Sequence, residues 1–512
     1  MGVLLPTLLS LWFPPRLGND ASMLTLSWNH FVRTGAPCSL PELDPANIAA
    51  DTSIPLSWWS PGPIWLIGAL SLGGLNFGQA ISLCLAVTGW LQLAGWRRLY
   101  CQLGFAPNIA AGSLVLIAGS WHTLYSFRNF LGGDVFAAAL LPWIALLLLR
   151  SRSVSLPRVF GSFTAALLLA VFFKLSFFIT AAGLAAGACI VAFTEQSKRE
   201  HHRRALSYGL VLGAALLLAW AIAHALLLRH GGSPADPAPI ALEPASALRR
   251  ALLPLVLPFA SLVAFTSSGA KLSDAFGIAH LPENTAMVAV AAALAFTLHV
   301  ALWRRAPSRM ARGFVASVSA VYFLAFATLY LRGSAVSFED RLFVPCGWFL
   351  LPGLLALGWQ SQGVMARALG VAFVAIALGW GVGSYVVRVR ELARAANFSA
   401  RGYSLTKLPA VVEREVRIAD RELPTDDALF ASTSLECLLA VEHNRVAKLS
   451  APDLELHGRP RRGIVVILPP GVPVGPQLAR FTDYRSDEWH VRAVAQWNIC
   501  VTPDSRPPSS FQ

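Results

Sequence analysis

Two aspartates lie where long apolar segments of this sequence meet polar ones. Asp20 follows the apolar run 2–14, and Asp134 follows two glycines at the start of the run 134–149. Ionisable groups at such borders are costly and rare, and they therefore indicate function. An ionised carboxylate there can take a proton from a hydroxyl or an amine, so both residues are candidate catalytic bases. The structural alternative is that each aspartate caps the helix that follows it.

Two cations occupy similar positions. Lys174 interrupts a long apolar stretch, and Arg341 begins another directly after Glu339 and Asp340. A lysine and an arginine held at such borders can bind a phosphate group, the arginine through two parallel hydrogen bonds. The alternatives are that Lys174 extends to the polar surroundings and that Arg341 pairs with one of its acidic neighbours.

Weaker candidates lie near these four residues. Arg128 could add to a phosphate site, and His122 could bind substrate or make an ordinary hydrogen bond at a helix end. Asp51 and the adjacent Trp58 and Trp59 could hold a sugar, although aromatic residues are common at membrane borders without such a role. Two carboxylates together with His122 could instead hold a divalent metal ion, and the sequence leaves this open.

The elements that must position these residues are membrane helices. Of the 512 residues, 55% are apolar and only 13% are charged, and the mean hydropathy is +0.56. Soluble globular chains carry roughly 25% charged residues. The shortage of charge excludes a cytosolic enzyme, a disordered protein and a disulfide-rich secreted scaffold, and it predicts a mostly α-helical protein that crosses the membrane many times.

A membrane-crossing helix needs about 20 mostly apolar residues, with a range of about 17–25. We interpret about eleven runs as spans, two of which form a tight hairpin around Lys174. No small-residue cleavage site follows the short opening run, so we expect a first span rather than a signal peptide. The runs are 2–14, 76–95, 108–126, 134–149, 159–173, 176–193, 206–228, 284–303, 313–331, 342–359 and 368–387.

Basic clusters between alternate runs predict the orientation, because positive loops stay in the cytoplasm. They place the N-terminus inside and the segments 15–75 and 229–283 outside, if the apolar piece 251–265 lies at the interface or dips into the membrane. The clusters also explain the net charge of +13 without a nucleic-acid partner. The basic clusters are Arg97–Arg98, Arg150 with Arg152 and Arg158, Lys198–Arg204, and Arg304–Arg305 with Arg309 and Arg312.

The last quarter of the chain has an ordinary mixture of charged and apolar residues. We therefore expect a transmembrane domain over 1–387 and a small extracytoplasmic α/β domain over 388–512. Within the latter, 406–422 has the spacing of an amphipathic helix, and 463–468 is typical of a buried strand. Cys437 and Cys500 both fall in this domain, and the sequence leaves open whether they form a disulfide.

This layout resembles the GT-C superfamily of integral-membrane glycosyltransferases, and in particular the bacterial relatives of protein O-mannosyltransferases and aminoarabinose transferases. Its members have an acidic residue after the first span and a second one at the start of the fourth. A Pro-rich stretch comparable to 60–67, a lysine near the fifth-to-sixth turn and an Arg-aromatic-Pro element comparable to Arg341–Pro345 complete the pattern. The motifs are short, and by layout they extend over most of the chain.

The resemblance implies a role for each of the four charged residues. Asp20 would be the catalytic base and Asp134 a second acidic site, while Lys174 and Arg341 would hold the phosphate of a polyprenyl-phosphate sugar. The expected protein is an inverting glycosyltransferase of a cell membrane. The expected membrane is the bacterial inner membrane, and the enzyme acts on its outer face beside membrane lipids. The alternatives are a transporter or lipid flippase, for which charges near the midplane and inverted repeats would be expected, and a non-catalytic assembly protein. The sugar, the acceptor and the oligomeric state stay open.

Overall fold

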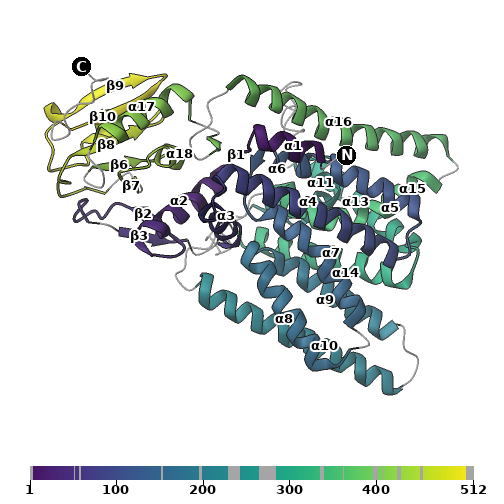
Figure 1. Cartoon of the computed structure of the whole chain (residues 1–512). Coiled ribbons are helices and arrows are strands. Elements are labelled where there is room, and N and C mark those ends of the chain that lie inside the picture. Colours follow the sequence, from purple (N-terminus) through teal and green to yellow (C-terminus); the bar gives the residue numbers. More distant parts are fainter. Residues whose placement is uncertain are drawn as a thin grey trace.

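The architecture is that of a computed structural model, in which a bundle of long helices carries a sheet-containing part at one end (Figure 1). The structure describes residues 4–502 except for 51, 57–58, 152–153, 195–198, 229–242, 265–283, 335–338, 361–362, 396–401, 406–407, 424–427 and 450–453.

Ten helical segments in the described part of the chain are long and apolar enough to cross a membrane. Nine of them match runs read from the sequence, which confirms the predicted polytopic helical class. They are α4 (Phe77–Gln102), α7 (Asp134–Ser151), α8 (Leu156–Phe173), α9 (Phe177–Thr194), α10 (Arg199–Ala223), α11 (Pro244–Leu262), α13 (Thr285–Arg305), α14 (Arg309–Leu331), α15 (Val344–Gln360) and α16 (Val364–Ala395).

Two of the predicted spans are not found as single long helices. The opening run forms α1 (Leu4–Trp12), whose nine residues extend only about 14 Å at 1.5 Å per residue. The run 108–126 is broken into α5 (Pro107–Gly119) and α6 (Trp121–Ser126). At the break, Ser120 has an extended backbone and its hydroxyl accepts the N–H of Thr123. Such a serine cap begins a new helix rather than continuing the old one.

The apolar piece 251–265 was expected at the interface, but it belongs to α11, a nineteen-residue candidate span. Near the start of α11, the carbonyl of Ala245 accepts a hydrogen bond from the Thr285 hydroxyl at the start of α13. Farther along, the rings of Phe259 and His299 are 4.7 Å apart. The two helices therefore run in the same direction, so α13 still begins at the end of the bundle where α11 begins.

The basic clusters gather at one end of the bundle. Arg97, Arg98 and Arg150 line a common open cleft where α4 and α7 end. In the turn between α13 and α14, Ser308 donates a hydrogen bond of 2.6 Å to the carbonyl of Leu103, just after α4. The positive-inside rule predicts that this end faces the cytoplasm.

The C-terminal part contains the expected sheet, and the first long loop adds two strands to it. The order is β3-β2-β7-β6-β8-β10-β9, in which β6, β7 and β8 are parallel. The bounds are β2 (Ser39–Glu42), β3 (Thr52–Pro55), β6 (Leu429–Ser432), β7 (Arg445–Lys448), β8 (Ile464–Leu468), β9 (His490–Val494) and β10 (Trp497–Val501).

Strand β8, which lies between β6 and β10 in the sheet, is buried along its whole length, as its continuous apolar sequence predicts. The amphipathic helix α17 (Ala410–Glu422) and the short α18 (Leu435–Leu439) pack on one face of the sheet. Cys437 lies in the hydrophobic cluster of that face and Cys500 in the cluster of the other. Both thiols are free, because the sheet separates them.

Candidate functional site

A short parallel sheet brings the two aspartates together. Strand β1 (Arg16–Leu17) pairs with β4 (Asn129–Phe130), and the N–H of Gly18 donates to the carbonyl of Phe130. The chain then enters α2 (Asn19–Thr34) on one side and α7 on the other, so Asp20 and Asp134 both lie in first helical turns at the same level. The residue in the capping position of α2 is Gly18, which has no side chain, so Asp20 does not have the capping role.

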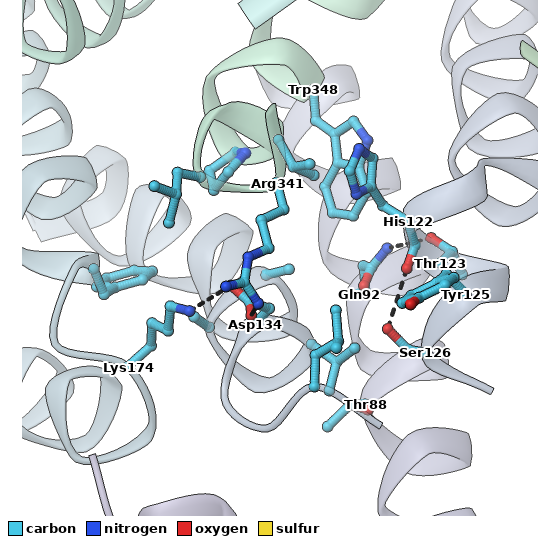
Figure 2. A pocket seen from close by; sticks show the side chains of 18 of the residues that line it. Thr88, Gln92, His122, Thr123, Tyr125, Ser126, Asp134, Lys174, Arg341 and Trp348 are labelled. Carbon is cyan, nitrogen blue, oxygen red and sulfur yellow. Dashed lines mark hydrogen bonds and ion pairs between the residues drawn. The ribbon is translucent and has the colours of Figure 1, made fainter. Parts of the chain in front are cut away.

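The four charged residues expected at the site form one ionic network, drawn in part in Figure 2. Lys174 Nζ is 2.7 Å from Asp134 Oδ1, and Arg341 Nη1 is 3.3 Å from Asp20 Oδ2 and 3.9 Å from Asp134 Oδ2. Arg341 also pairs with Glu339, as the structural alternative supposed. All four side chains are 23–27% exposed, so water screens these pairs less than fully exposed ones.

Close backbone packing determines where Lys174 lies. The carbonyls of 171–173, the last three residues of α8, each meet a different partner. The hydroxyl of Ser60 donates to the first at 2.7 Å. Cβ atoms placed on Gly62 and Gly133 would lie 2.5 and 1.9 Å from the other two carbonyl oxygens. The Pro-rich stretch and the glycine before Asp134 thus hold the end of α8 against the site.

We expect Gly133→Ala to lower the affinity of the protein for polyprenyl phosphate at least about tenfold, because small displacements of binding groups have large effects. The new methyl group cannot occupy the position of the Phe173 carbonyl, so Lys174 must move away from Asp134. The measurement is ligand binding in nanodiscs. Gly161→Ala on α8 is the matched control, since a Cβ there meets nothing within 4 Å. Equal affinity in both variants would contradict the positioning role of Gly133.

A partly open pocket lies beside the ionic network. Asp134, Lys174 and Arg341 line one side of it, and α4 and α6 line the other (Figure 2). On α6, which is outside the ten candidate spans, the buried Nε2 of His122 has no hydrogen-bond partner among the described residues. Burial lowers the pKa of His122 below its ordinary value, although Asp340 and Asp134 act in the opposite direction. The ring is therefore neutral at pH 7.

The other residues expected at the site are placed elsewhere. The guanidinium of Arg128 donates to the carbonyl of Ser384 on α16 at 3.0 Å and lies over the ring of Tyr125. It is not among the residues that line the pocket, and its expected role in phosphate binding stays a prediction. Trp59 packs against the hydrophobic cluster between α2 and the sheet. Asp51 and Trp58 fall outside the described residues.

Several polar residues of the pocket were not predicted from the sequence. Thr88 and Gln92 come from α4, and Thr123 and Ser126 come from α6. Gln92 carried a usable signal, because an amide inside an apolar run is costly to bury without a partner. The three hydroxyl residues carried none, since small hydroxyl residues are ordinary in membrane helices.

The alternative of a metal site is not favoured by the geometry. Among the described residues, no group of three or more His, Cys, Asp and Glu side chains is arranged to hold a metal ion. The carboxylates of Asp20 and Asp134 are paired with Arg341 and Lys174 instead.

A scan of the sequence finds no matching family model and no matching curated protein. The fold of this chain is similar to that of several solved structures. ArnT from Cupriavidus metallidurans bound to undecaprenyl phosphate matches with a TM-score of 0.54 and 14% identity, covering 99% of this chain and 97% of that one. The mycobacterial arabinofuranosyltransferase AftD matches with a TM-score of 0.51 and 14% identity, covering 98% of this chain and 39% of that one. The predicted GT-C fold is confirmed.

Proposed function

We propose that this protein is a glycosyltransferase that moves a sugar from a polyprenyl-phosphate donor to an acceptor at the sheet-bearing end of the bundle. The observation that carries the proposal is the network of Asp20, Asp134, Lys174 and Arg341 at the edge of a pocket. The similar fold of ArnT, crystallised with undecaprenyl phosphate, supports a lipid-linked donor.

The donor phosphate would lie against Lys174 and Arg341, the two cations that line the pocket. Those cations already face the carboxylates of Asp20, Asp134 and Glu339. The formal charge of these five side chains together is therefore negative. A phosphate must therefore take over hydrogen bonds that the carboxylates now accept. Exchange of one anion for another at Arg341 keeps its guanidinium paired, as a partly buried cation requires.

Asp20 contacts Arg341 but does not line the pocket, so we place it on the side from which the acceptor approaches. Its carboxylate takes the proton of the acceptor hydroxyl or amine while the acceptor atom forms a bond to the anomeric carbon. The bond from that carbon to the phosphate oxygen breaks, and the polyprenyl phosphate leaves with the electron pair. Attack opposite the leaving phosphate inverts the anomeric centre.

The assay for this function is reconstitution of the protein into liposomes with polyprenyl-phosphate donors that carry a labelled sugar. Transfer of the label to lipid, glycan or peptide acceptors is the expected result, and heat-treated protein is the control. Movement of intact donor across the bilayer without transfer would contradict the proposal and favour a lipid flippase.

We also expect the sheet-bearing end, including the tail 388–512, to lie outside the cytoplasm of a bacterial inner membrane. A membrane-impermeant thiol reagent applied to intact cells should then label Ser486→Cys, an exposed position before β9. The native Cys101, exposed near Arg97 and Arg98, should be labelled only after the cells are opened. The reverse pattern would place the site on the cytoplasmic side and would overturn this orientation.

A further inference from the structure

We infer that the sugar of the donor is electrically neutral, that is, it carries neither a free amino group nor a carboxylate. This inference rests on the proposed function, because it places the donor phosphate against Lys174 and Arg341. The sugar attached to that phosphate then extends across the pocket toward α4 and α6 (Figure 2).

The wall of the pocket formed by α4 and α6, opposite Lys174 and Arg341, is here called the far wall, and it offers neutral hydrogen-bonding groups. Gln92 is only 4% exposed, and its amide N–H lies 3.5 Å from the hydroxyl oxygen of Thr123. The hydroxyl of Thr88 donates to a backbone carbonyl of its own helix at 2.7 Å, and that of Ser126 donates to the carbonyl of His122 at 3.1 Å. Because these protons are used internally, the hydroxyl oxygens are left as acceptors for the hydroxyl groups of a sugar.

Two further features of this wall suit an uncharged polar ligand. His122 is neutral and its buried Nε2 has no partner among the described residues, so it can pair with a sugar hydroxyl. The rings of Trp121 and Tyr125 stack at 4.1 Å and line the pocket together with Trp348. Aromatic faces pack against the apolar C–H faces of a ligand while leaving its polar edges to hydrogen-bond donors and acceptors.

A charged sugar would lack a partner at this wall. Among the described residues that line the pocket, the carboxylate is Asp134. Its Oδ1 pairs with Lys174 at 2.7 Å and its Oδ2 lies 3.9 Å from Arg341, both on the phosphate side, so a sugar ammonium at the far wall would meet no acid there. A sugar carboxylate would meet no cation there, since Lys174 and Arg341 lie on the phosphate side. Buried charges without partners are strongly disfavoured.

The test is a competition assay in nanodiscs, in which unlabelled ligands displace fluorescent undecaprenyl phosphate. The competitors are undecaprenyl phosphate itself and its esters with a neutral pentose or hexose, a 4-amino pentose and a hexuronic acid. We expect the neutral esters to bind at least about tenfold more tightly than both charged esters, a difference of about 1.4 kcal/mol. An amino or uronic ester that binds as tightly as the neutral ones would overturn the inference. Failure of undecaprenyl phosphate itself to bind would overturn the proposed function instead.

A charge placed on the far wall provides an independent test. Gln92→Glu should raise the affinity for the amino-sugar ester relative to the neutral ester, because the new carboxylate can pair with the ammonium group. Gln79→Glu on the same helix is the matched control, since Gln79 is exposed and a glutamate there keeps the capping box with Asn76. An unchanged preference in Gln92→Glu would show that the sugar does not reach this wall and would overturn the inference.

Discussion

Replacing Asp20 with asparagine should lower the rate of sugar transfer about 100-fold or more, the usual range for loss of a general base. Asparagine keeps the shape of the side chain but cannot take a proton from the acceptor. The substitution also frees Arg341 from one of its carboxylates, so the affinity for polyprenyl phosphate should stay the same or rise. The measurements are initial transfer rates in liposomes and ligand affinity in nanodiscs.

This pair of measurements separates a catalytic role of Asp20 from a structural one. Loss of both transfer and ligand binding would identify Asp20 as a residue that merely holds Arg341 in place. A wild-type rate would exclude it as the base. Asp487→Asn is the control, because that carboxylate is 73% exposed in the tail and its loss should change neither quantity.

Replacing Arg341 with methionine should weaken the binding of polyprenyl phosphate about 30-fold or more, equivalent to about 2 kcal/mol. Arg341 faces Asp20, Asp134 and Glu339, so its removal takes away a phosphate ligand and leaves three carboxylates close together. Their repulsion should also lower the melting temperature. Arg341→Lys should have an intermediate effect, because an ammonium group keeps the charge but cannot span two carboxylates as a guanidinium does.

A double variant keeps this prediction testable even if Arg341→Met folds poorly. Asp20→Asn combined with Arg341→Met removes one of the repelling carboxylates, so the melting temperature should recover while phosphate affinity stays low. Arg332→Met, at the exposed end of α14, is the control and should bind normally. Normal affinity in Arg341→Met would mean that the phosphate lies elsewhere.

Much of the fold follows from properties that each segment of the chain carries by itself. Hydropathy identified nine of the ten candidate spans, and the return of normal composition identified the α/β tail. The scarcity of charge in the apolar segments singled out Asp20, Asp134, Lys174 and Arg341, which the structure joins in one network. Burying an ionisable group has a high cost wherever the fold places it, so residue type and position along the chain were sufficient.

The remaining features depend on a local helix cap or on contacts between distant segments. The break at Ser120 depends on a local cap, which an average over an apolar run does not register, and α16 packs so closely across it that a Cβ on Gly381 would lie 2.0 Å from the Gly119 carbonyl. The extension of the sheet by β2 and β3 requires pairing of the first loop with the tail. Hydropathy does not encode such pairings, because each is a relation between two segments rather than a property of either one.

The site illustrates the same division. Sequence alone indicated which residues would carry charge at the membrane border, because charge is a property of the residue. The pairing of β1 with β4 determines the distance between the two aspartates, and the close contact at Gly133 determines where Lys174 lies. The neutral wall of α4 and α6 becomes visible only when those helices are packed, since threonine, serine and glutamine acquire a common role by facing one cavity.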